Sequence, residues 1–251
     1  MTWGGIASIS ESVLCLKEPH ETKAIFAGVV REALETLTAQ LARISFVQVG
    51  ANDGIHADHL HPLVMSGRWH GLLIEPAPRP YARLLQTYRD VGGLAFEQLA
   101  VSEQEGCLPF FYVEGDDGLS SLSLDTILSH APKYENLRNM IRPMTVTARR
   151  LDDICDDHGL RCPAVIAVDS EGMDDVVLKS FSIEARRPAI ILFEHCHLSA
   201  ERSAALRDRL IAANYRILHD RHDALALRRG VFEDKVVQSF SDRISATRPT
   251  A

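Results

Sequence analysis

Residues 46–54 read Phe46-Val47-Gln48-Val49-Gly50-Ala51-Asn52-Asp53-Gly54, an apolar run that enters a turn bounded by two glycines. Glycine adopts the backbone angles of a tight turn and lets a ligand approach the main chain closely. About twenty residues further on, a second apolar run ends in Glu75-Pro76, and an acidic residue at the tip of a second strand can accept hydrogen bonds from both ribose hydroxyls. The two features together favour a nucleoside-binding strand and loop over a merely structural turn.

Further apolar runs alternate with helical patterns along the chain. Val165–Val168 and Ala189–Phe193 are apolar throughout, as expected of strands buried on both faces. The runs 215–218 and 224–228 are close in sequence and are predicted to pair antiparallel. This order predicts an α/β, Rossmann-like fold: a doubly wound, mostly parallel sheet with an antiparallel terminal strand and helices on both faces.

The same pattern divides the chain into three parts. Residues 1–43 are predicted to form an N-terminal extension draped over the domain and an amphipathic helix, because apolar residues recur at helical spacing between Glu21 and Arg43. Residues 44–232 form the predicted domain, with an irregular insertion near 114–143 that we expect to act as a lid or substrate loop. Residues 233–251 are polar and are expected to fray.

Bulk composition excludes several classes of protein. The 251 residues carry a formal net charge of -7, which argues against nucleic acid as the main partner. No run of about 18 apolar residues is present, so no membrane span is expected. The five cysteines form no CxxC pair, and the start of the chain does not resemble a secretory signal, so a cytoplasmic location is predicted. A homo-oligomer is left open.

The loop also indicates which cofactor fits. A pyrophosphate binder of the NAD type favours G-x-G-x-x-G, whereas this loop carries Asn52 and Asp53. An aspartate would repel a pyrophosphate but suits an amine and a positively charged sulfonium. S-adenosylmethionine is therefore predicted in preference to NAD, and an NAD-dependent oxidoreductase is the chief rival among enzymes.

From Phe46 to Arg228 the sequence resembles the FkbM family of methyltransferases. The resemblance is carried, in order, by QVGANDG (48–54), GLLIEPAPRPYARLLQTY (71–88), LAFEQLAVSEQEGCLPFFYV (94–113), GLSSL (118–122), VTARRLDDI (146–154), IAVDSEGMDDVVLKSF (166–181) and AIILFEHCHLS (189–199). It implies a class I methyltransferase fold and methyl transfer to oxygen, commonly on a sugar, glycan or secondary metabolite. The acceptor is thus expected to be a carbohydrate or another small molecule.

The resemblance and the loop geometry together assign the residues of the cofactor site. Those expected to contact S-adenosylmethionine are Gly50, Ala51, Asn52, Asp53, Gly54, Glu75, Pro76, Ala100, Val101, Ser121 and Asp169. Where many family members have a small or aromatic residue, this chain has His56. Together with His59 and His61 it could form a metal cluster, but an exposed helix surface is the favoured interpretation.

Catalytic candidates cluster at the ends of two predicted strands, where ligands bind in open α/β sheets. They are Asp169, Glu171, Glu194, His195 and His197. Either histidine is a candidate base, because the pKa of imidazole lies near neutrality, and an extended backbone would point both the same way.

Three alternatives remain open for these groups and for the function. Asp169, Glu194 and His195 could hold a Mg²⁺-like ion that lowers the pKa of the acceptor hydroxyl. The acidic residues could simply cap a helix, and the histidines could serve as structural hydrogen-bonding groups. The chain could also be a non-catalytic cofactor- or partner-binding module, or methylate nitrogen or a phenol.

Overall fold

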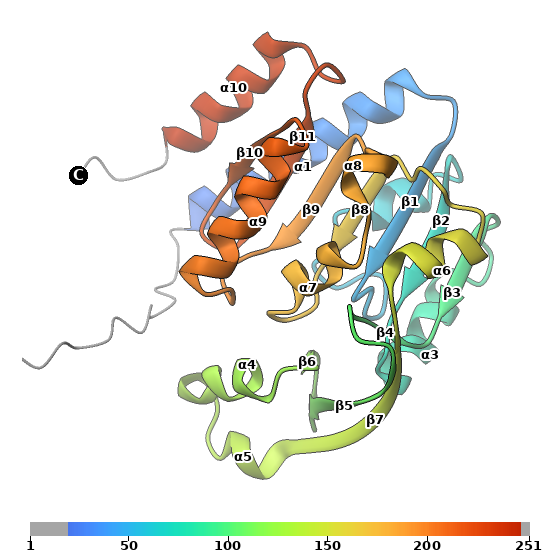
Figure 1. Cartoon of the computed structure of the whole chain (residues 1–251), viewed down its shortest axis with the longest axis vertical. Helices are drawn as coiled ribbons and strands as arrows, with labels where there is room; N and C mark the ends of the chain where they lie inside the picture. The colour runs from blue at the N-terminus through green and yellow to red at the C-terminus, as the bar shows by residue number, and fades with distance from the viewer. Residues whose placement is uncertain (1–19, 247–251) are drawn as a thin grey trace, which may run out of the picture.

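The computed structural model describes residues 20–246 of the chain, so most of the predicted N-terminal extension and residues 247–251 lie outside the described residues. A seven-stranded sheet forms the centre (Figure 1). In chain order its strands are β1 (Ile44–Val49), β2 (Trp69–Ile74), β3 (Leu94–Glu97), β8 (Val165–Val168), β9 (Ile190–Glu194), β10 (Tyr215–His219) and β11 (Asp223–Arg228). Their spatial order is β10-β11-β9-β8-β1-β2-β3.

The strand directions confirm the predicted fold class. The central strand β1 runs parallel to both its neighbours, β2 and β8. The last strand in the sequence, β11, lies between β9 and β10 and is antiparallel to both. The fold is therefore a doubly wound, Rossmann-like α/β structure with a reversed strand near one edge.

Alternate residues of the strands face two layers of helices. Phe46 faces one layer, made of α1 (His20–Gln40), α2 (His61–Val64), α3 (Pro78–Thr87) and α10 (Asp234–Ser245). Val47 faces the other, made of α6 (Leu151–Asp157), α7 (Asp174–Lys179), α8 (Ile183–Arg186) and α9 (Ala200–Ala212). The helix predicted between residues 21 and 43 is confirmed as α1, and none of the helices within residues 20–246 is long and apolar enough to span a bilayer.

The expectation of a fraying polar tail is wrong for residues 234–245, which form α10. Val237, Phe240 and Ile244 recur at helical spacing and are buried, and α10 packs against α1. Arg243 Nη1 also lies 2.5 Å from Glu32 Oε2 of α1. The polar residues between these three apolar positions conceal the stripe when composition alone is considered.

A second, four-stranded sheet lies below the central one in Figure 1. Its strands, in the spatial order β4-β7-β5-β6, are β4 (Ala100–Val101), β7 (Ile141–Arg149), β5 (Gly106–Val113) and β6 (Asp116–Ser121). The helices α4 (Leu124–Ser129), η1 (Ala131–Lys133) and α5 (Leu137–Met140) connect β6 to β7. The insertion near 114–143 therefore consists of regular strands and helices, whereas the sequence pattern predicts an irregular segment. Its strands bury few residues, so their sequences show no clear alternation of apolar and polar residues.

Candidate functional site

The loop after β1 is held between the carboxyl ends of β2 and β8. The backbone N–H groups of Gly50 and Ala51 both donate to Ile74 O, at 2.9 and 3.0 Å. Gly50 has a φ of +75°, and a Cβ atom there would lie 1.7 Å from the carbonyl oxygen of Asp169. Only glycine therefore fits at this position, as the sequence pattern predicts.

Glu75 follows β2 and is locked by the backbone. Its Oε2 accepts from Asn52 N at 2.9 Å, and its Oε1 accepts from Ala77 N at 2.8 Å. The residue is 4% exposed, and this burial raises the pKa of Glu75 to about 7 despite the two donors. The carboxylate is held in one orientation before any ligand arrives.

A cleft that is partly open to solvent lies between the two sheets. Five of the predicted cofactor residues line it, namely Gly50, Glu75, Pro76, Ala100 and Val101. Sequence analysis did not assign the other lining residues, which are Val49, Leu99, Phe110, Ser120, Leu122, Ser170, Met173 and Val177. The cleft therefore has mainly apolar walls with one carboxylate at its edge.

The other loop residues stabilise the conformation of the loop. Asp53 Oδ1 accepts from Ile55 N and His56 N, at 3.0 and 2.9 Å, so this carboxylate is engaged by its own turn. Asn52, at a φ of +47°, donates from Nδ2 to Asp117 O at 3.2 Å and so ties the loop to the hairpin of the small sheet. Ala51 and Gly54 are buried. Contact between these four residues and the cofactor remains a prediction.

Ser121 holds a turn of the chain and does not line the cleft. Its hydroxyl donates to Glu171 O at 2.8 Å and accepts from Ser123 N at 3.0 Å. Its neighbours Ser120 and Leu122 line the cleft instead. Successive side chains of a strand point to opposite faces, so Ser121 faces away from the cleft, and its contact with the cofactor remains a prediction.

Asp169 follows β8 and faces solvent at the site. Its backbone N–H donates to Val49 O at 2.9 Å, which continues the pairing of β8 with β1. The residue is exposed, but the surrounding protein still removes part of the water around its carboxylate. This desolvation raises the pKa of Asp169, although the positive charge of Lys23 acts to lower it. Its carboxylate accepts no hydrogen bond from the described part of the chain.

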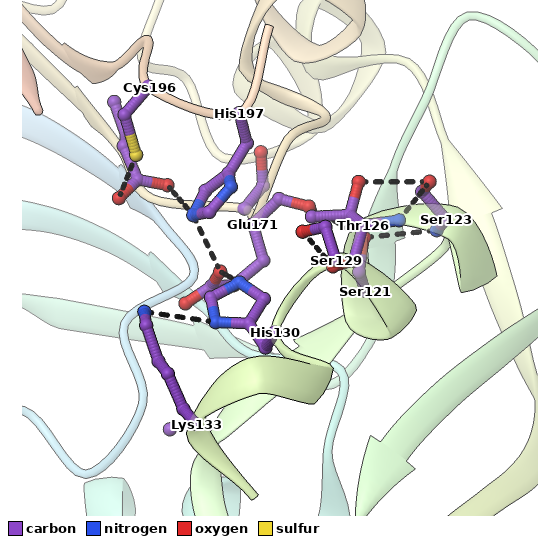
Figure 2. A network of polar contacts seen from close by, with 12 residues as sticks. Ser121, Ser123, Thr126, Ser129, His130, Lys133, Glu171, Cys196 and His197 are labelled. Carbon is purple, nitrogen blue, oxygen red and sulfur yellow. Dashed lines mark hydrogen bonds and ion pairs between the residues drawn. The ribbon is translucent and has the colours of Figure 1, made fainter. Parts of the chain in front are cut away.

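Beyond Asp169, four side chains meet between α4 and the loops that follow β8 and β9 (Figure 2). Glu171 Oε2 lies 3.7 Å from His130 Nε2 and 3.6 Å from His197 Nε2. His197 Nε2 is also 3.6 Å from Glu194 Oε2. The two imidazole rings lie side by side, with their centroids 4.7 Å apart. Three of the predicted catalytic residues, Glu171, Glu194 and His197, are thus brought together.

The pKa shifts of these side chains favour neutral carboxyl groups and a neutral imidazole, so they oppose the formation of ion pairs. Burial, then the negative charge of Asp169, raises the pKa of Glu171 to about 8 and that of Glu194 to about 10. Burial, then His130, lowers the pKa of His197 to about 4. The contacts of 3.6–3.7 Å are also too long for hydrogen bonds. The four side chains therefore lie next to one another without forming hydrogen bonds to one another.

The prediction that His195 and His197 point the same way is wrong. The chain turns after Glu194, and His195 faces the β10–β11 hairpin, where its Nε2 donates to Asp220 O at 3.2 Å. Its ring packs edge-on against His219. Burial, then the neighbouring His219, lowers the pKa of His195.

The predicted set of Mg²⁺ ligands is also wrong, because the turn after Glu194 directs His195 away from the two carboxylates. Asp169, Glu194 and His195 form no common group of potential ligand atoms within residues 20–246. The three histidines after the cofactor loop form none either: His56 and His59 are exposed, and His61 Nδ1 lies 3.2 Å from Tyr88 Oη.

Sequence reasoning missed His130 and a set of buried polar supports. His130 directly follows α4, in the insertion, and no local motif marks it. Asp174 is fully buried and accepts from Glu194 N at 3.0 Å and from Ser170 Oγ at 3.0 Å, which ties the ends of β8 and β9 together. The two consecutive acids Asp174 and Asp175 at the start of α7 were a usable signal, because the first turn of a helix favours acidic side chains.

Many solved structures are similar to this chain, and two of them serve as examples. One is the methyltransferase FkbM from Methylobacillus flagellatus KT, at 17% identity and a TM-score of 0.48, covering 82% of this chain and 58% of that chain. The present chain thus spans less than two thirds of that protein. The other is human methyltransferase-like protein 13 in complex with SAH, at 12% identity and a TM-score of 0.42, covering 93% of this chain and 95% of that one.

Sequence comparison gives the family. The chain is 25% identical over 165 residues to the 2-O-methyltransferase NoeI of Sinorhizobium fredii (strain NBRC 101917 / NGR234), covering 61% of this chain and 67% of that protein. The family model described as methyltransferase FkbM domain matches residues 48–217, a range that contains the cofactor loop, the cleft and the polar group beside it. This chain belongs to the FkbM methyltransferase family.

Proposed function

We propose that this protein is an S-adenosylmethionine-dependent O-methyltransferase that acts on a hydroxyl group of a carbohydrate or a similar small molecule. The observation that carries the proposal is the cleft lined by Gly50 and Glu75, whose wall also includes Ser170, the residue between Asp169 and Glu171 in the sequence. Family membership supports the methyl transfer. The similar protein from S. fredii is a 2-O-methyltransferase by name, which supports oxygen as the acceptor atom.

The residues of the cleft fit the proposed cofactor. The apolar side chains of Leu99, Val101 and Phe110 suit a purine ring, and the locked Glu75 carboxylate suits a ribose diol. The absence of a side chain at Gly50 leaves the backbone open to close approach. When bound, the cofactor supplies a methyl group made electrophilic by the attached sulfonium.

Asp169 is the group we place against the acceptor. Its carboxylate is exposed and adjoins Ser170, which lines the cleft. It can orient an acceptor hydroxyl and receive its proton as the new O–C bond forms and the C–S bond breaks. The partly buried surroundings of Glu171 and Glu194 limit water around the reacting groups.

Calorimetric titration with S-adenosylhomocysteine tests the cofactor assignment. We expect saturable binding to the wild-type protein and none of comparable strength with NAD. Glu75→Ala should weaken binding about 10- to 100-fold, because hydrogen bonds from the ribose to a carboxylate are lost. Glu97→Ala is the matched control, since Glu97 ends the neighbouring strand β3 but does not line the cleft. A folded wild-type protein that binds NAD and not S-adenosylhomocysteine would overturn the proposal.

The acceptor class requires a separate assay. Methyl transfer from S-adenosylmethionine is measured to a panel of sugars and oligosaccharides, each paired with its amino-sugar analogue. We expect product from hydroxyl acceptors with the methyl group on oxygen. Transfer to the amine alone, in a protein that binds the cofactor, would contradict the oxygen assignment and leave the cofactor assignment standing.

The raised pKa of Glu75 predicts a pH dependence of cofactor binding. With a pKa of about 7 in the free protein, Glu75 is largely protonated at pH 6 and ionised at pH 8. Ribose hydroxyls donate to the ionised form, so binding favours it and affinity should rise about tenfold between these pH values. Glu75→Gln should lose this rise, and the difference between the two proteins removes the titration of the ligand itself. Identical pH profiles would contradict the prediction.

A further inference from the structure

We propose that His130, Glu171 and His197 bind a divalent transition-metal ion, with Glu194 as an adjacent carboxylate. The site joins the insertion, which supplies His130, to the loops after β8 and β9, which supply the two other ligands (Figure 2). It differs from the predicted Mg²⁺ set in every residue but Glu194. The inference is independent of the acceptor and of the methyl transfer proposed above.

The separations between the donor atoms match those around one metal ion. His130 Nε2 and His197 Nε2 lie 3.7 and 3.6 Å from the same carboxylate oxygen, Glu171 Oε2. Metal–nitrogen and metal–oxygen bonds of about 2.0–2.2 Å in a tetrahedral site place neighbouring ligand atoms about 3.3–3.6 Å apart. Ligand atoms of His130, Glu171 and His197 all lie within 4.8 Å of one another. A small shift of side chains would bring all three onto one ion.

Unsatisfied buried atoms point into the same space. His130 Nε2, Glu171 Oε2 and Glu194 Oε2 are buried and have no hydrogen-bond partner. His130 is only 8% exposed. Buried polar atoms without partners are uncommon in native proteins, because each loses its hydration without replacement. Three of them facing one another have a common explanation in a cation that all would bind.

The donor types select the class of metal. Two imidazole nitrogens and one or two carboxylate oxygens suit Zn²⁺, Fe²⁺, Mn²⁺ or Co²⁺. Mg²⁺ and Ca²⁺ prefer oxygen donors throughout. Cys196 forms a second group with Glu194 and His197, but its Sγ already lies 3.5 Å from Glu194 Oε1. The group of His130, Glu171 and His197 is therefore the better candidate for a metal site.

Backbone contacts hold Glu171 in place for this role. The residue has a φ of +49°, which non-glycine residues rarely adopt. Ser121 Oγ donates to its carbonyl oxygen at 2.8 Å, and Arg202 Nη2 donates to the next carbonyl, that of Gly172, at 2.9 Å. Fixing the backbone on both sides of a ligand orients it before the ion binds.

Lys133 competes with the metal for His130. Its Nζ lies 3.2 Å from His130 Nδ1, and because an ammonium group only donates, this contact leaves the imidazole proton on Nε2. A metal at Nε2 needs that proton to move to Nδ1, so Lys133 has to release the ring. Lys133 is exposed and can do so. Removing it should strengthen metal binding several-fold.

Titration of the metal-free protein with Co²⁺ tests the site through its visible absorption, a readout that does not depend on activity. We expect about one equivalent bound, with a d–d spectrum typical of four- or five-coordinate Co²⁺, and displacement by Zn²⁺. His130→Gln, Glu171→Gln and His197→Gln should each abolish the spectrum or weaken binding by tenfold or more. Lys133→Met should bind several-fold more tightly.

Matched controls separate this site from other histidines and cysteines. His195→Gln removes an imidazole two residues from His197 that faces away from the site, and Cys196→Ala removes the nearest thiol. Both should leave the spectrum unchanged. Thermal unfolding confirms that each variant is folded. Absence of Co²⁺ binding in the folded wild type, or a spectrum that depends on His195 or Cys196 and survives His130→Gln, would overturn the proposal.

Discussion

Gly50→Ala will yield a protein that is severely destabilised or fails to fold. The new Cβ would lie 1.7 Å from the carbonyl oxygen of Asp169, an atom of the main chain at the end of β8. That carbonyl cannot retreat without disturbing the pairing of β8 with β1, where Asp169 N donates to Val49 O. A φ of +75° adds strain for any residue with a side chain. We expect a loss of about 4 kcal/mol or more in the free energy of unfolding, a large part of the stability of an ordinary domain.

Gly67→Ala is the control for the backbone angle. Gly67 has a φ of +74°, almost the same as Gly50, but a Cβ there meets no atom within 4 Å. Its substitution should cost only about 1–2 kcal/mol. Urea denaturation monitored by circular dichroism measures both losses. Equal losses in the two variants would show that the contact between Gly50 and Asp169 is not decisive.

The second large effect is expected at Arg202. Its guanidinium binds the Asp175 carboxylate through both Nη2 and Nε, with the Nε contact at 3.2 Å, and it also donates to Gly172 O. The Asp175 side chain is fully buried. Among residues 20–246, Arg202→Met therefore leaves the buried carboxylate with Lys179, at 2.9 Å, as its one remaining cationic partner. We expect a loss of about 2–4 kcal/mol in the free energy of unfolding.

Substitutions of two exposed cations serve as controls for the loss of unfolding free energy in Arg202→Met. Lys179→Met removes a half-exposed partner of Asp175, and Arg207→Met removes an exposed cation 3.7 Å from Asp208. Each should cost less than about 1 kcal/mol. Desolvation tends to raise the pKa of Asp175, but the hydrogen bonds and charges of Arg202 and Lys179 together outweigh it, and the net pKa is lowered. The stabilisation is therefore present above the unfolded-state pKa and lost at lower pH, so the difference between wild type and Arg202→Met should narrow below about pH 4. A constant difference would contradict this account.

Much of the fold is readable in the sequence because the central strands carry an unambiguous pattern. Val165–Val168 and Ile190–Phe193 are apolar on both faces because helices cover both faces. The helix α10 was not recognised, since Val237, Phe240 and Ile244 are separated by polar residues. The insertion was not resolved into strands and helices, because few of its side chains are buried.

The site was predictable as far as topology determines it. Parallel strands end at the same edge of a sheet, so Asp169, Glu171 and Glu194 were expected to gather near the cofactor loop. The direction of His195 was not predictable from an extended backbone, because the chain turns directly after β9. His130 could not be found from the sequence, since it reaches Glu171 only through the folding of the insertion over the loops of the main sheet. Contacts between distant segments leave no periodic trace in one sequence.

The position of β11 constrains the order in which the sheet assembles. Within residues 20–246, β10 pairs only with β11, and β11 alone connects it to β9. During synthesis, β10 emerges before its partner does, so it has no strand to join until residues 223–228 are also free of the ribosome. Until then the edge of β9, with Ile190–Phe193, remains unpaired, and unpaired apolar edges promote aggregation. A chaperone that covers this edge should therefore raise the yield of folded nascent protein.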